Sequence, residues 1–171
     1  MKYRKLGRTG LNVSVVGIGT WQFGGEWGLN YTQAEVDAIL DRGRELGINL
    51  IDTAECYGDH LSESFIGDYL SRRNREEWLI ATKFGHQFHE RFTRTDRFDA
   101  AAVLQQLDAS LKALKTTTSI YTSSTRGRMR RLTMMNCGRC WINKSKRGKS
   151  SISARRSAAM TIFIRPKLRP R

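Results

Sequence analysis

The distribution of acidic residues limits which part of this chain can form a globular domain of mixed charge. All 16 Asp and Glu residues lie between Glu26 and Asp108. Residues 1–116 carry 15 Lys and Arg against these 16 acids, a net charge of −1, whereas residues 117–171 carry 15 Lys and Arg and no acid, a net charge of +15. Globular domains usually mix both signs over about a quarter of their residues. We therefore expect one domain over residues 1–116 and a separate basic tail over residues 117–171.

Within the first 116 residues, short apolar runs alternate with segments of helical spacing. Two strand-like runs flank residues 7–10 and predict a hairpin. The further expected strands are residues 15–19, 48–51 and 78–82, and helices are expected to follow Thr32, Ser62 and Asp99. Three strand–helix units with continuous apolar strands indicate an α/β fold with a parallel sheet.

The expected helices have recognisable ends and apolar stripes. Thr32 and Glu35 have the spacing of a capping box, in which each side chain accepts a hydrogen bond from the other residue's backbone N–H. Ser62 and Asp99 are of the residue types that cap helices. The expected buried positions are Val36, Ile39, Leu40 and Leu46 in the first helix, Phe65, Ile66 and Leu70 in the second, and Leu104, Leu107, Leu111 and Leu114 in the third.

Polar residues stand where the expected strands end. Gly17-Ile18-Gly19-Thr20 lacks the third glycine of the Gly-x-Gly-x-x-Gly motif, which disfavours a doubly wound nucleotide-binding fold. Thr20, Asp52 and Lys83 each follow or end an apolar run. In a βα barrel, the carboxyl ends of the strands form the face that carries the active site.

The order and spacing of several motifs resemble the aldo/keto reductase family over about residues 1–116. These motifs are Gly19-Thr20-Trp21, Gly47-Ile48-Asn49, Asp52 with Tyr57 five residues later, Ser62-Glu63, and Lys83 at the end of the third strand. The resemblance implies an α/β fold that is part of a (β/α)₈ TIM barrel, with an N-terminal hairpin and the first three βα units. It also implies transfer of a hydride from NADPH to the carbonyl group of an aldehyde or ketone.

The resemblance assigns roles to individual residues. It implies that Tyr57 is the general acid, that Lys83 assists its proton donation and that Asp52 pairs with Lys83. It places Gly19, Thr20, Trp21 and Asp52 near the nicotinamide, although Trp21 could equally pack within the protein. The roles agree with simple chemistry, because a tyrosine in water has a pKa of about 10 and a neighbouring ammonium group favours the phenolate.

The basic tail departs from the family pattern, which continues into a fourth strand ending in a histidine. One set of codons for residues 117–125, regrouped one base earlier, encodes DYIDIYQFH, which resembles that strand. Codons for residues 158–165 regroup in the same way to SSNDNIYQ. We therefore interpret residues 117–171 as translated out of frame and expect them to be disordered on their own.

Other interpretations of the tail remain possible. The strongly cationic tail, which contains Tyr121, Trp141 and Phe163, could instead make this a basic nucleic-acid-associated protein. Cys137 and Cys140 have the spacing of a redox pair or half a zinc site, but two further ligands are lacking and no metal is expected. With three cysteines and no long apolar segment, a cytoplasmic protein without membrane contact is expected. The resemblance to the aldo/keto reductases implies a small carbonyl substrate, and no specific nucleic-acid binding is expected.

Overall fold

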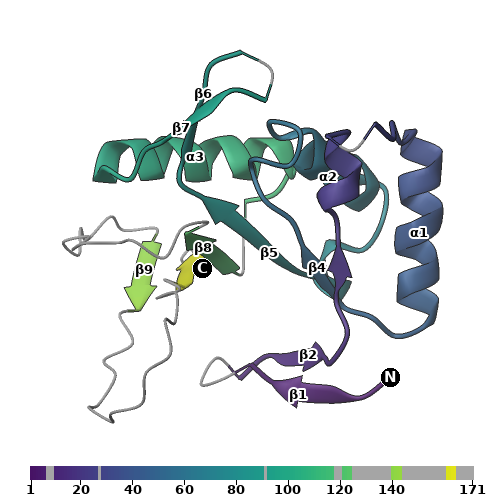
Figure 1. Cartoon of the computed structure of the whole chain (residues 1–171). Coiled ribbons are helices and arrows are strands. Elements are labelled where there is room, and N and C mark those ends of the chain that lie inside the picture. The colour runs from purple at the N-terminus through teal and green to yellow at the C-terminus, as the bar shows by residue number, and fades with distance from the viewer. Residues whose placement is uncertain are drawn as a thin grey trace, which may run out of the picture.

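A four-stranded parallel sheet forms the centre of the protein (Figure 1). The computed structural model describes residues 1–6, 10–26, 28–90 and 92–117 and three later strands at 121–124, 140–143 and 161–164. The sheet order is β3 (Ile18–Gly19), β4 (Leu50–Asp52), β5 (Leu79–Phe84) and β8 (Tyr121–Ser124). Within this sheet, neighbouring strands follow one another in chain order, as in a βα barrel. The architecture confirms the expected partial TIM-barrel fold, and β8 adds a fourth strand after the three βα units.

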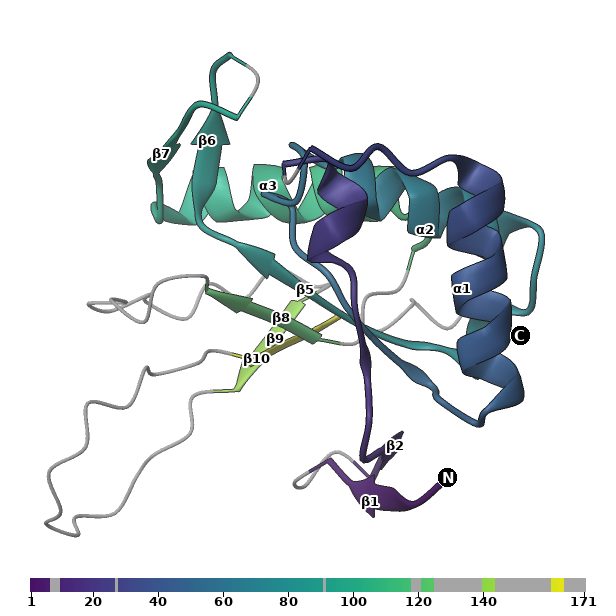
Figure 2. The same cartoon turned by 45° about the vertical axis from the view of Figure 1, so that its right-hand side comes forward.

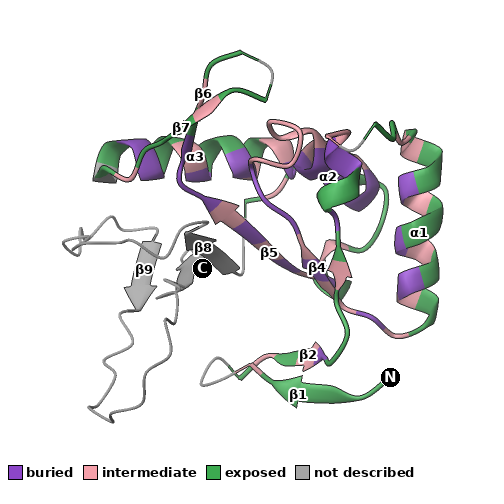
Figure 3. Cartoon of the chain, viewed as in Figure 1, coloured by how far each residue is buried: buried purple, intermediate pink, exposed green. Residues whose placement is uncertain are grey.

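Three helices connect these strands: α1 (Gln33–Glu45), α2 (Leu61–Ser71) and α3 (Ala100–Ala113). They lie together on one side of the sheet (Figure 2), with buried positions along the helix surfaces that meet the core (Figure 3). The core shared by the sheet and helices includes Val36, Leu40, Ile51, Ile66, Leu70, Trp78, Ile80 and Leu114. Its continuity explains why the apolar strands carry few charged residues.

Shorter elements surround the sheet. An antiparallel hairpin of β1 (Tyr3–Lys5) and β2 (Asn12–Ser14) precedes it, as expected. A second hairpin, β6 (His86–Phe88) and β7 (Arg94–Asp96), separates β5 from α3. The 3₁₀ turn η1 (Trp21–Gly24) follows β3, and the 3₁₀ turn η2 (Arg75–Glu77) precedes β5. In the tail, β9 (Cys140–Asn143) pairs with β10 (Thr161–Ile164). At these two strands and at β8 the structure differs from the expected disorder, and the rest of residues 118–171 lies outside the described residues.

The sequence predicted the N-terminal cap correctly for two of the three helices. The Thr32 side chain accepts a hydrogen bond from the Glu35 N–H and completes the capping box of α1, and Asp99 accepts from the Ala102 N–H at the start of α3. The prediction for Ser62 is wrong, because α2 begins at Leu61 and has His60 at its N-cap without a side-chain cap. The Ser62 hydroxyl instead contacts polar groups from two strand ends.

Several apolar residues lie outside the core despite their favourable spacing. Val15 and Val16 are about half exposed, and only Ile18–Gly19 of the expected first strand pairs in the sheet. Ile39 and Leu46 also lie on the exposed side of α1, because the helix rests on the core through Val36 and Leu40. Likewise Leu104 is exposed on α3, where Val103, Leu107 and Leu114 are buried.

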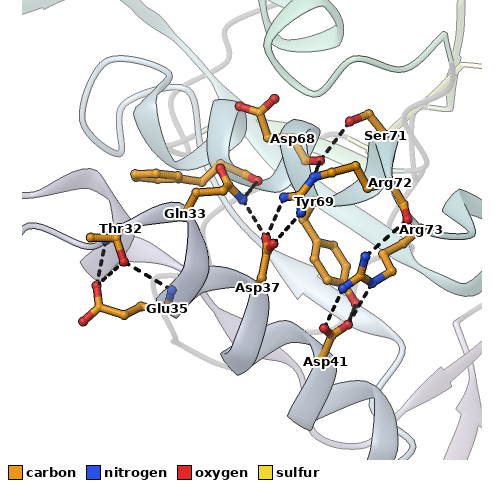
Figure 4. A network of polar contacts seen from close by, with 11 residues as sticks. Thr32, Gln33, Glu35, Asp37, Asp41, Asp68, Tyr69, Ser71, Arg72 and Arg73 are labelled. Carbon is orange, nitrogen blue, oxygen red and sulfur yellow. Dashed lines mark hydrogen bonds and ion pairs between the residues drawn. The ribbon is translucent and has the colours of Figure 1, made fainter.

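Ion pairs join α1 to the end of α2 (Figure 4). Arg72 donates two hydrogen bonds to Asp37, at 2.7 and 3.0 Å, and Arg73 donates to Asp41. Partial burial of Asp37 opposes its ionisation, but the hydrogen bonds from Arg72 and Gln33 hold its pKa below the usual range. These contacts fix the relative position of the two helices along the edge of the core.

Two close backbone contacts require glycine. A Cβ at Gly67 would lie 2.2 Å from the carbonyl oxygen of Ala113, so the glycine allows α2 to pack directly against the end of α3. Gly58 has a φ of +68°, and a Cβ there would lie 2.3 Å from the carbonyl oxygen of Gly24. The Gly24–Gly58 contact holds the turn after β4 against η1.

Among the described residues, no helix combines the length and apolarity required to cross a membrane.

Candidate active site

Asp52, Tyr57 and Lys83 come together at the carboxyl ends of two adjacent parallel strands. Asp52 is the last residue of β4, and Lys83 is the residue before the end of β5. Residue Asp52 pairs with Ala81, so Lys83 lies two residues further along the neighbouring strand, on the same side of the sheet. Tyr57 belongs to the turn that follows β4. The structure thus brings together all three residues that the resemblance assigns to catalysis.

The amino group of Lys83 is the centre of this site. Its Nζ donates to Asp52 Oδ1 at 2.8 Å and to the backbone oxygen of Thr53 at 3.0 Å, and lies 3.0 Å from the Tyr57 hydroxyl. These three acceptors match the three N–H donors of a lysine ammonium group. Partial burial favours the neutral amine, but the contacts with Asp52 and Tyr57 outweigh it and raise the pKa of Lys83. Lys83 is therefore a cation at neutral pH.

The expected cofactor residues differ in how they face this site. Trp21 is 45% exposed and stacks on Tyr57 with 6.2 Å between ring centroids. A Cβ built on Gly19 would meet nothing within 4 Å among the described residues, so there is open space beside this backbone. Thr20 is buried, and its hydroxyl donates to the backbone oxygen of Asp52. Thr20 thus joins the ends of β3 and β4, while Trp21 and Gly19 offer accessible surface.

A network of buried hydroxyl groups supports the strand ends. The Ser62 Oγ lies 2.9 Å from Thr20 Oγ1 and 3.0 Å from Thr53 Oγ1. The three hydroxyls therefore connect β3, the turn after β4 and the first turn of α2. The sequence pattern predicted that Ser62 caps α2, and only its distance from Thr20 in the folded chain reveals its actual role.

Two buried glutamates form the layer behind the strand ends. Glu63 accepts a hydrogen bond from Thr82 Oγ1 at 2.5 Å and lies 2.5 Å from His60 Nδ1. Burial disfavours a charged His60, but Glu63 outweighs this effect and raises the pKa of His60. Glu55 lies 3.0 Å from His86 Nδ1. The sequence motifs did not predict these Glu–His pairs. Glu63 belongs to the Ser62-Glu63 motif but His60 does not, and Glu55 and His86 are 31 residues apart in the chain.

The predictions for metal and nucleic-acid binding involve the tail. In the described part of the chain, no three His, Cys, Asp or Glu side chains are grouped so that they could hold a metal ion. Cys137 lies outside the described residues, whereas Cys140 begins β9. All 15 Lys and Arg residues of the tail, the alternative nucleic-acid contact, also lie outside the described residues.

Comparison with known proteins supplies relatives for the domain. The model of the aldo/keto reductase family matches residues 15–122. The chain is 41% identical over 93 residues to pyridoxal 4-dehydrogenase of Microbacterium luteolum, and 37% identical over 119 residues to L-galactose dehydrogenase of Arabidopsis thaliana. These matches cover 54% and 67% of this chain, but 27% and 35% of the relatives.

A solved structure agrees with the same assignment. The holo form of an aldo-keto reductase from Bacillus halodurans is 30% identical and superimposes with a TM-score of 0.65, covering 72% of this chain and 40% of that protein. The chain thus spans about a quarter to two fifths of the length of these relatives. Since the family model matches more than half of the chain, the protein belongs to the aldo/keto reductase family.

Proposed function

We propose that this chain is the N-terminal part of an NADPH-dependent oxidoreductase that reduces aldehydes or ketones to alcohols by hydride transfer. One observation carries the proposal: Lys83 Nζ is within hydrogen-bonding distance of both Tyr57 and Asp52. A carbonyl group that receives a hydride becomes an alkoxide and needs a proton. The site supports this chemistry because it places a phenol beside a cation whose own charge is neutralised by a carboxylate.

Tyr57 is the proton donor in this proposal. Lys83 donates a hydrogen bond to the Tyr57 oxygen, so the hydroxyl hydrogen remains available to the carbonyl oxygen of a substrate. After donation, the Lys83 ammonium stabilises the phenolate, and Asp52 keeps the ammonium in place. General acid catalysis of this kind contributes about 10²–10⁴-fold to a rate.

The proposed cofactor site lies beside this proton donor. NADPH, when bound, supplies the hydride. The exposed face of Trp21 and the open space at Gly19 fit a flat ring such as nicotinamide, and Asp52 borders the same strand ends. Thr20 supports the site from beneath by hydrogen bonding to the backbone of Asp52. Both curated relatives are named as dehydrogenases, and in that direction Tyr57 would accept the proton of an alcohol.

The genetic code supports the proposal that the tail is translated out of frame. Met and Trp have one codon each, ATG and TGG, so the shifted codon that follows either residue always begins with G. Whatever codons are used for Met134–Cys137, the shifted reading gives Asp, Glu and Leu in succession. The codons of Cys140–Ile142 likewise give Leu and Asp. The shift therefore restores acidic and aliphatic residues to a segment that has no acid as written.

We expect the chain as written to lack measurable carbonyl reduction. Positioning of two reactants can contribute about 7–11 kcal/mol to catalysis, and in this proposal the later parts of the barrel supply much of it. In the restored frame, a histidine would stand one residue after Ser124, which pairs with Phe84 beside Lys83. Restoring one base before the codon of Thr117 should therefore restore activity together with the remaining barrel sequence.

The test compares NADPH oxidation by the 171-residue chain and by the frame-restored protein, with a simple aldehyde as substrate. In the restored protein, Tyr57→Phe should abolish turnover with little change in NADPH affinity. Tyr31→Phe is the matched control, because it also removes a phenol hydroxyl but lies beside Phe23. Normal turnover by Tyr57→Phe, or NADPH oxidation by the chain as written, would refute the proposal.

A further inference from the structure

Glu63 is a buried carboxylate that the proposed proton transfer does not use directly. It lies in the first turn of α2, and its side chain is fully buried. Its Oε1 accepts a hydrogen bond from Thr82 Oγ1, and its Oε2 lies against His60 Nδ1, each at 2.5 Å. The two oxygens of one carboxylate therefore contact two different segments of the chain, β5 and the turn after β4.

The contact with Thr82 fixes β5 next to Lys83. Thr82 immediately precedes Lys83 in the strand, so the two side chains point to opposite faces of the sheet. The Thr82 side chain is buried, whereas Lys83 extends from the other face to reach Asp52 and Tyr57. Glu63 therefore holds the strand from the side opposite to the Lys83 amino group.

The contact with His60 fixes the turn that carries Tyr57. Asp59 and His60 end this turn with φ values of +51° and +71°, in the left-handed region that residues with a Cβ rarely adopt. Such a conformation persists where surrounding contacts determine it. The His60 N–H donates to the backbone oxygen of Glu55 at 2.7 Å, and Glu63 holds the imidazole ring. Glu63 therefore helps to keep the turn in its shape.

We propose that Glu63 is a positioning residue for Lys83 and Tyr57. Its carboxylate joins β5 to the turn after β4, and the 3.0 Å contact between Lys83 Nζ and the Tyr57 hydroxyl joins the same two segments at the site. Hydrogen bonds of this type span about 2.7–3.2 Å, so a shift of about 1 Å in either segment breaks the contact. The importance of this contact for catalysis rests on the proposed function, but the contact itself requires neither NADPH nor a substrate.

The test measures the reactivity of Lys83 in the 171-residue chain. Burial opposes the charge of Lys83, but the contacts with Asp52 and Tyr57 outweigh burial and raise the pKa of its amino group. Only the neutral amine reacts with acetic anhydride, so these contacts slow its acetylation. Trace acetylation at pH 8, followed by peptide mass spectrometry, gives the rate at Lys83 relative to that at Lys112, which is exposed on α3.

Glu63→Asp is the variant that separates reach from charge. The aspartate keeps the carboxylate, but it is one methylene shorter and cannot contact both Thr82 and His60 from the same position in α2. We expect the acetylation of Lys83 relative to Lys112 to rise about 3-fold or more, which corresponds to a fall of about half a unit in the pKa of Lys83. An unchanged ratio in a folded Glu63→Asp chain would overturn the proposal.

Two controls distinguish positioning from a general loosening of the chain. Glu63→Gln keeps the length of the side chain, and its amide can donate to one partner and accept from the other, so Lys83 should react as in the parent chain. Ser14→Ala removes another buried hydroxyl, which accepts from the Asn49 N–H at 3.1 Å, but this residue precedes β4 at the opposite end of the sheet. A rise in either control as large as that in Glu63→Asp would contradict a positioning role for Glu63.

Thr82→Val decides the proposal if circular dichroism shows that Glu63→Asp is unfolded. Valine suits a strand and removes only the hydroxyl that contacts Glu63, so the same rise in acetylation is expected. A folded Thr82→Val chain with the parent ratio would refute the positioning role. The outcome is independent of NADPH oxidation by the frame-restored protein: if Tyr57→Phe abolishes turnover there while Lys83 acetylation does not change in these variants, only the role of Glu63 is wrong.

Discussion

The substitution Gly58→Ala tests whether the Gly24–Gly58 contact holds the Tyr57 turn in place. Alanine at position 58 destabilises the folded chain in two ways. The φ of +68° at this position costs an L-residue about 1–2 kcal/mol, and the new Cβ would lie 2.3 Å from the Gly24 carbonyl oxygen. Overpacking of this kind typically costs about 1–3 kcal/mol more. Replacing glycine also reduces the conformational entropy of the unfolded chain, which stabilises the protein by about 0.4–1 kcal/mol. We therefore expect the free energy of unfolding to fall by about 1–5 kcal/mol.

Gly28→Ala provides the matched control. Gly28 has a similar φ of +76°, but a Cβ there meets nothing within 4 Å among the described residues. Both variants place alanine at a positive φ, and both reduce the entropy of the unfolded chain. The difference between their free energies of unfolding therefore measures the steric contact at Gly58, about 1–3 kcal/mol. Urea unfolding followed by far-UV circular dichroism should show a midpoint about 1 M lower for Gly58→Ala than for Gly28→Ala. Equal midpoints would refute the argument that the turn is held by this backbone contact.

Three further predictions concern stability. Thr32→Ala should lower the free energy of unfolding by about 0.5–2 kcal/mol in urea titrations, because it removes the side-chain cap of α1. Arg72→Ala should lower the urea midpoint slightly through loss of the two hydrogen bonds to Asp37, and the difference should shrink in about 1 M NaCl; a difference that persists there would argue against an electrostatic cause. The raised pKa of His86 stabilises the folded chain fully below pH 6.5, and this contribution is lost as the pH rises towards about 9. Urea midpoints of the parent chain should thus fall between these pH values more than those of His86→Gln, and parallel curves would contradict the assignment.

The strand ends and their polar residues could be predicted from the sequence because they depend on local patterns. Parallel strands have their carboxyl ends at one edge, and the resemblance to the aldo/keto reductases implies that Asp52 pairs with Lys83 at that edge. The burial of Val36 and Leu40 likewise follows from helical spacing, whereas the exposure of Ile39 depends on which side of α1 finds a neighbour. Local spacing cannot supply that information.

Contacts between distant residues account for what sequence analysis missed. Ser62 has the residue type of a helix cap, but α2 already begins at Leu61, and the Ser62 hydroxyl contacts Thr20, 42 residues away in the chain. Glu55 and His86 are each ordinary in the sequence, and only the fold brings the imidazole of His86, in β6, to the Glu55 carboxylate. The side chains that support the site therefore could not be predicted from the sequence, whereas those at its centre belong to a recognisable motif.

The arrangement of Asp52, Tyr57 and Lys83 has a consequence for how such barrels can be divided. All three side chains belong to neighbouring β4 and β5 and the turn between β4 and α2, so their geometry is set within one βα unit and the next strand. The proton-transfer half of the proposed reaction is therefore encoded in a contiguous stretch of chain. A barrel cut after α3 would separate this half from the later strands without dividing it. Such a fragment would be a natural partner for complementation in trans, in which a second polypeptide carrying the later strands pairs with the outer edge of the sheet.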